Sequence, residues 1–448
     1  MNSGGVQAIY SDASATSTTI NSGGKLNVYS GGSAVDITQN SGGVIDTNTS
    51  ATLSGTNTNG SFSIANGSAS NMLLENGGYL YVLNGHQATS TTINGGGHQE
   101  VSSGGSATST TINRGGYLYV SGGGSAVDIT QNSGGAIDTN TSATLSGTNT
   151  NGSFSIANGS ASNMLLENGG YLSVLNGHQA TSTIINSGGR QEVYDGGSAT
   201  STTINSGGYL YVSGGGSAVD ITQNSGGAIS ADTSATLRGT NTNGSFSIAN
   251  GSAVNMLLVN GGAMYVDSGH HATSTTINSG GDQRVLYRGS ATNTTINNGG
   301  RQEVFEGGSA TNTTINSGGG LQVNSYGSAV GITQNSGGAI SADTSATLSG
   351  TNINGSFSIA NGSASNMLLE NGGSLAVFNG HQASNTTINS GGKLNVYSGG
   401  SAVDITQNSG GAISADTSAT LSGTNTNGSF SIAGGSAVNM LLENGGSL

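Results

Sequence analysis

The chain contains no cysteine, no proline and no tryptophan among its 448 residues. Without cysteine it has neither disulfides nor thiolate chemistry. The absence of proline suits a chain whose strands all lie inside sheets, because a proline there would remove a ladder hydrogen bond. Charged residues make up only 6% of the sequence, with 8 basic side chains against 21 acidic ones and a formal net charge of −13. This balance excludes the basic patch by which nucleic-acid-binding proteins hold phosphates.

Long apolar runs and helical patterns are missing as well. The longest apolar stretches are too short to span a bilayer. Each of the 81 glycines would cost about 1 kcal/mol relative to alanine in a helix interior. The opening residues, Met1 to Gly4, enter a repeat at once and show no signal peptide. Neither end carries the cap that a solenoid needs, so we expect a fragment from inside a longer array.

In place of these features the chain repeats one short unit, which restarts at every nineteenth position, for example at Asn94, Asn113 and Asn132. The unit reads Asn-Ser-Gly-Gly-x-Leu-x-Val-x-x-Gly-Gly-Ser-Ala-x-x-(Ile/Thr)-Thr-(Gln/Ile), as in residues 21–39 and 389–407. A period in this range is typical of a solenoid. An array offers a long repeated surface, which favours adhesion over a single catalytic site.

A longer cassette, such as 40–75, interrupts these units at five places. It begins at Asn40, Asn132, Asn224, Asn335 and Asn408, and the differences between successive starts are 92, 92, 111 and 73. The three distinct values, 73, 92 and 111, are spaced by 19, which indicates that whole units were gained or lost. We divide the first cassette into two units, 40–56 and 57–75, which places Phe62 and Ile64 where the standard unit has Leu26 and Val28. On this division residues 1–448 form a single continuous array of 24 units.

Each unit has the pattern of short strands joined by tight turns. Leu26 and Val28 alternate with polar neighbours, as in a half-buried strand, and Ala34 and Ile37 are the next residues expected to point inward. Stacking every strand beside its copy, about 4.8 Å away, predicts an all-β fold. We expect a parallel β-helix of about 24 coils, mostly of 17–19 residues each, since one repeat then makes one turn of the solenoid.

Two sets of residues are expected to support this stack. The asparagine that opens each unit should form a hydrogen-bonded ladder along one corner. The cassette phenylalanines should fill the core at Phe62, Phe154, Phe246, Phe357 and Phe430.

The sequence predicts no catalytic, cofactor or metal site. A glycoside-cleaving site needs two converging carboxylates, and the densest acidic pairs are Glu192 with Asp195 and Glu303 with Glu306. We interpret these pairs, with the nearby arginines Arg190 and Arg301, as a solvated face. Four histidines share one repeat position but lie five or six coils apart, too far to share a zinc ion: His86, His178, His270 and His381.

Two runs carry a resemblance to a known family: NSGGxQxVxxGGSATxTTI and SGTNTNGSFSIANGSASNMLLENGGYLYVLNGHQAT. They resemble the passenger domains of self-associating autotransporters, the AIDA, TibA and antigen 43 group of Gram-negative bacteria, over essentially the whole chain. The resemblance implies a right-handed β-helix exported through the periplasm and outer membrane to the bacterial surface. It also implies autoaggregation, biofilm formation and, in some members, attachment to host cells. The signal peptide and translocating barrel of such proteins are not in this sequence.

Passengers of the AIDA and TibA kind further imply O-heptosylation on serines by a cytoplasmic heptosyltransferase. A serine at a glycine corner is expected to be exposed and accessible, although it also suits a simple polar turn. The candidate acceptors are Ser33, Ser106, Ser125, Ser198, Ser217, Ser290, Ser309, Ser328 and Ser401.

The expected partner is a second copy of the chain, with a host-cell surface as a further candidate. Columns of Thr, Ser and Asn with few charges favour lateral, antiparallel pairing, because many weak linked contacts act together. The candidate contacts are Thr58, Asn59, Thr108, Ser109 and Thr111. The alternatives are a carbohydrate-active β-solenoid and an ice-binding one, although Val35 and Asp36 break the regular threonine array that ice binding requires.

Overall fold

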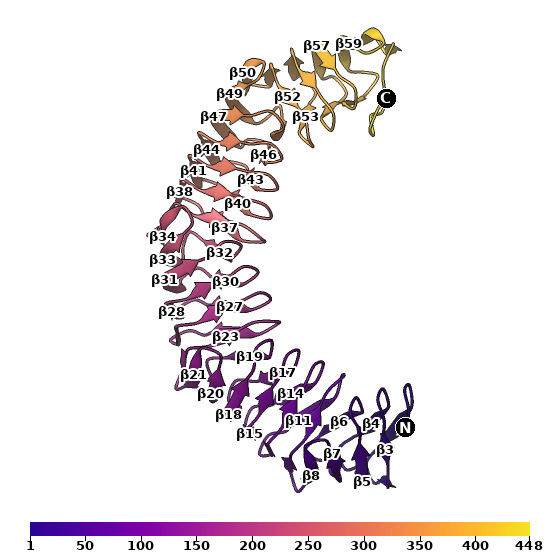
Figure 1. Cartoon of the computed structure of the whole chain (residues 1–448). Coiled ribbons are helices and arrows are strands. Elements are labelled where there is room, and N and C mark those ends of the chain that lie inside the picture. Colours follow the sequence, from indigo (N-terminus) through magenta and orange to yellow (C-terminus); the bar gives the residue numbers. More distant parts are fainter. The chain divides into compact units, whose positions relative to one another are not determined.

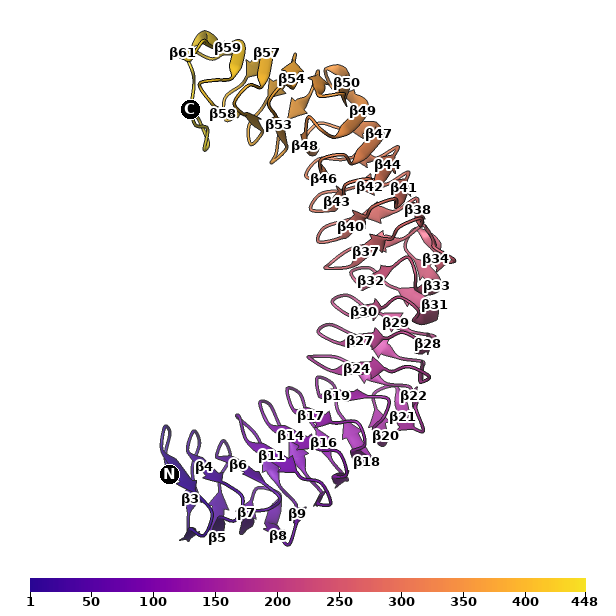
Figure 2. The same cartoon turned by 180° about the vertical axis from the view of Figure 1, so that it is seen from behind.

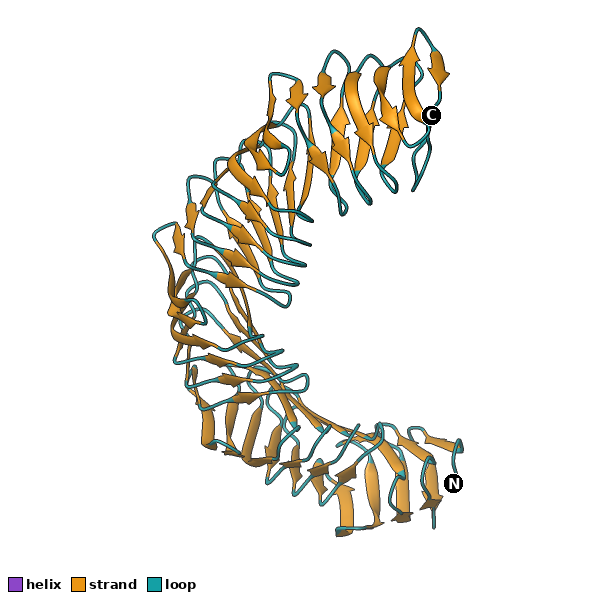
Figure 3. Cartoon of the chain, turned by 45° about the horizontal axis from the view of Figure 1, so that its top comes forward, coloured by secondary structure: helices purple, strands orange, loops and turns teal.

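The computed structural model describes all 448 residues, and every regular element in it is a β-strand (Figure 3). No helix in it has the length and apolar character needed to cross a membrane. The chain divides into two compact units, Met1–Gly227 and Ala228–Leu448. Within each unit the chain winds in successive coils whose strands lie side by side (Figures 1 and 2). The prediction of an all-β solenoid is therefore confirmed.

Sheet A contributes one strand to each coil, and neighbouring strands pair in parallel. Lys25 pairs with Val6 on one side and with Val44 on the other, one repeat away in each direction. In the first unit the strands of sheet A are β1 (Val6–Ile9), β4 (Lys25–Val28), β6 (Val44–Asn48), β11 (Tyr79–Val82), β14 (His98–Val101), β17 (Tyr117–Val120), β19 (Ala136–Asn140), β24 (Tyr171–Val174), β27 (Arg190–Val193) and β30 (Tyr209–Val212). In the second unit they are β32 (Ala228–Asp232), β37 (Ala263–Val266), β40 (Asp282–Val285), β43 (Arg301–Val304), β46 (Gly320–Val323), β48 (Ala339–Asp343), β53 (Ser374–Val377), β56 (Lys393–Val396) and β58 (Ala412–Ala415).

Sheet B forms the opposite side of each coil. A standard coil gives it a longer strand, a corner residue and a shorter strand, as in β15 (Ser106–Thr108), Ser109 and β16 (Thr111–Ile112). The corner residue has a left-handed backbone, with φ of 57° at Ser109. In the first unit the other standard strands of sheet B are β2 (Ser14–Thr16), β3 (Thr19–Ile20), β5 (Ser33–Gln39), β10 (Leu73–Leu74), β12 (Gln87–Thr89), β13 (Thr92–Ile93), β18 (Ser125–Gln131), β23 (Leu165–Leu166), β25 (Gln179–Thr181), β26 (Ile184–Ile185), β28 (Ser198–Thr200), β29 (Thr203–Ile204) and β31 (Ser217–Gln223). In the second unit they are β36 (Leu257–Leu258), β38 (His271–Thr273), β39 (Thr276–Ile277), β41 (Ser290–Thr292), β42 (Thr295–Ile296), β44 (Ser309–Thr311), β45 (Thr314–Ile315), β47 (Ser328–Gln334), β52 (Leu368–Leu369), β54 (Gln382–Ser384), β55 (Thr387–Ile388) and β57 (Ser401–Gln407).

Each cassette is one coil with a hairpin inserted in sheet B, and not the two coils predicted. In the first cassette β7 (Thr52–Asn57) pairs in parallel with β5, then β8 (Gly60–Ala65) and β9 (Ser68–Ser70) follow in antiparallel pairings. In sheet A, β6 meanwhile pairs directly with β11. The division of the cassette into two units is therefore wrong, and Phe62 and Ile64 lie on an antiparallel strand.

The same hairpin recurs in every cassette. The corresponding strands are β20 (Thr144–Asn149), β21 (Gly152–Ala157) and β22 (Ser160–Ser162); β33 (Thr236–Asn241), β34 (Gly244–Ala249) and β35 (Ser252–Val254); β49 (Thr347–Asn352), β50 (Gly355–Ala360) and β51 (Ser363–Ser365); and β59 (Thr420–Asn425), β60 (Gly428–Ala433) and β61 (Ser436–Val438). Sheet A therefore counts 19 strands and the chain 19 coils, five fewer than the 24 units expected. At each cassette sheet B gains two strands, and each adds a spacing of about 4.8 Å. Neighbouring coils are therefore farther apart on the side of sheet B than on the side of sheet A.

The interior of the coils is a narrow apolar column. Leu26, Val28, Ala34 and Ile37 are at most 1% exposed, which confirms the predicted inward positions. The cassette phenylalanines are also buried, at 2–3% exposure, although on the inserted hairpins: Phe62, Phe154, Phe246, Phe357 and Phe430.

Some coils place glutamine where others have the inward leucine of sheet A. Gln283 and Gln302 are fully buried, and Nε2 of Gln302 donates to Oε1 of Gln283 at 2.8 Å. The hydroxyl of Thr294 also donates to Oε1 of Gln283, at 3.2 Å. These bonds satisfy polar atoms that burial would otherwise leave unpaired.

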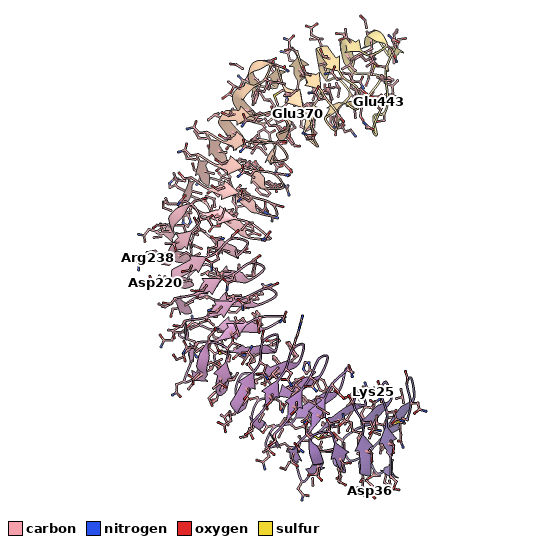
Figure 4. All side chains as sticks on the ribbon, viewed as in Figure 1. Lys25, Asp36, Asp220, Arg238, Glu370 and Glu443 are labelled. Carbon is pink, nitrogen blue, oxygen red and sulfur yellow. The ribbon has the colours of Figure 1, made fainter.

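The predicted asparagine ladder is present. Nδ2 of Asn113 donates to Oδ1 of Asn94 at 2.8 Å, and Nδ2 of Asn132 donates to Oδ1 of Asn113 at 2.7 Å. At four cassettes a glutamate takes the next ladder position, and its carboxylate accepts a backbone N–H; for Glu75 the donor is Gly42, at 2.6 Å. Glu370 also accepts from Asn389 of the following coil, at 3.2 Å. Figure 4 labels two of these glutamates, Glu370 and Glu443.

We expect Asn113→Ala to loosen the ladder locally, because the substitution removes both of its side-chain bonds and leaves a neighbouring amide without its partner. The expected cost is about 1–2 kcal/mol, measured as faster hydrogen exchange of the amides in strand β16. The control is Ser103→Ala, at an exposed turn one coil earlier. Equal exchange in the two variants would show that the ladder does not stabilise the coils.

Candidate self-association surface

The predicted contact residues Thr108, Ser109 and Thr111 lie on the outer side of sheet B. Ser109 is exposed and the two threonines are half-buried. Thr111 continues a row of threonines, because its register partners in the neighbouring coils are Thr92 and Thr130. Polar side chains therefore follow one another from coil to coil along this side.

The hairpin tip of the first cassette joins the same row. Thr58 and Asn59 are both exposed, and the N–H of Asn59 is fixed by Oδ1 of Asn57 at 2.8 Å. Nδ2 of Asn59 donates to the hydroxyl of Thr92 at 3.1 Å. The structure thus brings the two predicted groups together on one surface, which we call the Thr/Asn face: Thr58, Asn59, Thr92, Thr108, Ser109 and Thr111.

The contact between tip and threonine row recurs in the second unit. Asn243 donates to Thr276 at 3.1 Å, and Asn354 donates to Thr387 at 3.2 Å. In the second cassette Ile184 replaces the threonine. The fourth cassette keeps the contact through Asn354 but has the apolar Ile353, 64% exposed, in the position of Thr58.

The corner residues of sheet B form a second outward column, of which the sequence prediction named only Ser109. Non-glycine residues seldom adopt positive φ, and Asn and Asp do so most readily. Asp36, Asp128, Asp220 and Asp404 all have φ of 54–56° at this corner. Figure 4 shows Asp36 and the sheet-A residue Lys25 on opposite sides of the first unit. The restriction of this position to Ser, Asn, Asp and Gly was the signal available in the sequence.

The nine predicted acceptor serines lie less openly than expected. All nine are half-buried at the start of strands in sheet B. Their backbone is fixed as well; for example, the N–H of Ser106 donates to the carbonyl oxygen of His86 at 3.0 Å. The prediction that these serines are exposed is wrong, whereas Ser22, Ser187 and Ser206 in the Asn-Ser-Gly-Gly turns are exposed.

The four repeated histidines have a structural role. Nδ1 of His86 lies 2.8 Å from the hydroxyl of Thr49, and the same pair recurs at three of the other four cassettes. The His86 ring covers Gly67, where an added Cβ would lie 3.0 Å from it. Each histidine thereby holds the inserted hairpin against the following coil. No group of three or more His, Cys, Asp or Glu side chains is placed to hold a metal ion.

The predicted solvated face is wrong for Glu192 and Glu303, which are each only 8% exposed. Both lie on sheet A, and each carboxylate is paired with the arginine two residues earlier. Burial acts to raise the pKa of Glu192, but hydrogen bonds from Tyr171 and Tyr194 and the charge of Arg190 outweigh it, so the pKa is lowered. The carboxylate is therefore held in its charged form by its neighbours.

Comparison with known proteins gives a family match over most of the chain. The model of the AIDA family, described as "adhesin of bacterial autotransporter system, probable stalk", matches residues 54–116, 146–208, 238–300, 286–338, 349–421 and 422–448. The chain is 85% identical over 33 residues to the autotransporter adhesin/invasin TibA of Escherichia coli, and likewise 85% identical over 33 residues to the autotransporter CRAC of Citrobacter rodentium. Each match covers 7% of the present chain and only 3% of TibA or 2% of CRAC.

The solved structures similar to the chain include a TibC-catalysed, hyper-glycosylated fragment of TibA. It shares 34% sequence identity with the chain, and the alignment covers 90% of this chain and 97% of the fragment, with a TM-score of 0.24.

Proposed function

Because this chain belongs to the AIDA family of adhesin stalks in the bacterial autotransporter system, we propose that it pairs laterally with a second copy on a neighbouring cell. As part of an autotransporter adhesin, the chain is a surface-exposed passenger segment, exported through the outer membrane. Pairing of this kind produces autoaggregation and supports biofilm formation, with attachment to host cells as a further outcome. The role is structural and needs no catalytic step.

The observation that carries this proposal is the continuity of the Thr/Asn face. Hydroxyl and amide groups both donate and accept hydrogen bonds, so a surface made of them complements a copy of itself. An antiparallel arrangement related by a twofold axis places the same patch on both partners. Each contact is weak, but repetition along the coils gives the linked contacts a high effective concentration. We further propose that the 19 coils form one continuous array, which lengthens the pairing surface.

The test is the settling rate of cells that display the full-length adhesin. We expect the combined substitutions Thr58→Ala, Asn59→Ala, Thr108→Ala and Thr111→Ala to slow settling, because they remove side-chain donors from the pairing surface. The matched control substitutes four exposed turn residues that are not serines with alanine, namely Asn84, Asn176, Asp195 and Asn379. Unchanged settling in the first variant would contradict the proposal.

We also propose that serines of the chain are O-glycosylated by a cytoplasmic heptosyltransferase. The relative TibA is hyper-glycosylated by TibC catalysis. In the present chain the exposed turn serines, such as Ser22 and Ser187, offer better access than the half-buried predicted acceptors. Intact-mass measurement after co-expression with such an enzyme tests this, and peptide mapping then identifies the serines. An unmodified mass would contradict the proposal.

A further inference from the structure

The outer side of sheet A has a different chemistry from the Thr/Asn face. Its strands carry eight of the 14 tyrosines and five of the eight basic residues of the chain. The pairing proposed above uses sheet B and leaves these side chains without a role. The most developed cluster lies in the first unit, around strands β6 and β11.

A cleft of about 370 Å³ opens there on the sheet surface. Here β6 turns the small side chains Asp46 and Asn48 outward beside the larger Tyr79 and Tyr81 of β11, their register partners. We call it the first-cassette groove, and its residues are Val28, Tyr29, Asp46, Thr47, Asn48, Tyr79, Tyr81 and Glu100. A smaller cleft of about 210 Å³ recurs at the fifth cassette, where Tyr397 and Asp416 line it.

One wall of the first-cassette groove is an aromatic ring held in place. The rings of Tyr79 and His98 are stacked with centroids 4.7 Å apart, and His98 continues the column to Tyr117 at the same spacing. On its other side Tyr79 is the register partner of Asp46, so its second ring face is turned to the groove. The hydroxyl of Tyr79 bonds to Glu100, which fixes the ring further. Tyr29, 45% exposed, borders the groove from the preceding coil.

The polar groups of the groove determine which ligand fits. It contains two carboxylates, Asp46 and Glu100, and the only ammonium beside them is Lys25, which is paired with Asp46 at 2.9 Å. Burial lowers the pKa of His98, so this neighbour adds no positive charge at neutral pH. The groove is thus negative overall and has no unpaired cation for an anionic ligand. It offers carboxylate acceptors next to flat apolar rings.

We propose that the first-cassette groove binds a neutral glycan. Sugar hydroxyls are donors for the carboxylates of Asp46 and Glu100, and charge-assisted hydrogen bonds of this kind are the stronger ones. The C–H face of a pyranose ring packs on the exposed faces of Tyr29, Tyr79 and Tyr81, whose rings combine an apolar body with a polar tip. The volume lies within the range of small-ligand sites. This binding is independent of the lateral pairing, which uses the other sheet.

The test titrates the purified chain with cellohexaose, maltohexaose and chitohexaose, and with hexagalacturonate as the acidic comparison, by saturation-transfer NMR. We expect at least one neutral hexasaccharide to bind and the acidic one not to bind. Tyr81→Ala and Tyr29→Ala should each weaken binding by about tenfold or more. Tyr29→Ala changes an exposed side chain, so it keeps the test valid if Tyr81→Ala disturbs folding. The control is Tyr287→Ala, at a corner where the side chain is 56% exposed.

Three results would overturn the proposal. The first is that no neutral hexasaccharide binds. The second is that Tyr81→Ala and Tyr29→Ala bind the hexasaccharide as tightly as the control Tyr287→Ala. The third is slower cell settling in Tyr81→Ala without saccharide binding by the parent chain, which would identify a second copy as the occupant. Failure of the pairing proposal is measured separately. In that case cells displaying the combined substitutions on the Thr/Asn face would settle at the normal rate, while the groove still bound glycan.

Discussion

A chain from which residues 52–67 have been deleted is expected to fold into the same stack of coils with one hairpin fewer. The segment from Asn40 to Leu74 exceeds a standard unit such as 21–39 by the length of this deletion, so one standard unit is left. Ser68 then takes the place of Thr52 beside Ser33, at the start of a strand in sheet B. We expect a β-rich circular dichroism spectrum and a thermal midpoint within about 5 °C of the parent.

The matched control deletes residues 52–66, one residue fewer. A shift of one residue turns the inward side chains of a strand to the opposite face, so Ala69, which is fully buried, would point outward. We expect the control to lose cooperative unfolding and to aggregate. Equal stability of the two deletions would mean that coil register does not govern this fold, and the hairpin would then not be an insertion in a regular coil.

The insertion was already visible in the spacing of the cassettes. The differences between their starts, 92, 92, 111 and 73, equal four, four, five and three units of 19, with 16 left over each time. The prediction divided the cassette differently because Phe62 alternates with Ser61 and Ser63 as in any strand, and this period does not reveal whether a strand runs parallel or antiparallel. The tip Asn57 to Gly60 is a hairpin signal that identifies the reversal.

Features with a local cause were predictable. The inward positions of Leu26 and Val28 follow from alternation along one strand, and the asparagine ladder follows from identical residues one unit apart. Burial of Glu192 was not predictable in this way, because it depends on Tyr171, which is 21 residues earlier in the sequence. The Thr/Asn face likewise joins Asn59 to Thr92 across 33 residues, and only the folded coil brings them together.

Gly147→Ala is expected to destabilise the first unit by about 3 kcal/mol, because overpacking in a close-packed interior forces backbone shifts. An added Cβ would lie 2.2 Å from the backbone oxygen of Ile129 and 2.8 Å from its Cβ. Ile129 and Gly147 are register partners on adjacent strands, and Phe154 pairs with Gly147 on the other side. The new methyl group therefore has no direction in which to move. The measurement is the urea midpoint of unfolding.

Gly320→Ala is the matched control, because an added Cβ there meets no atom within 4 Å. Its effect should stay within about 0.5 kcal/mol. A similar loss of stability in both variants would mean that replacing any strand glycine, and not a steric clash, causes the effect of Gly147→Ala. A loss confined to Gly147→Ala would show a steric requirement instead.

The equivalent glycines of three other cassettes have the same close approach, at 2.1–2.2 Å, namely Gly55, Gly350 and Gly423. Each of these glycines lies seven residues before the buried phenylalanine of its cassette. A glycine at this position is then a condition for inserting the hairpin, which explains why the glycine and the phenylalanine recur together.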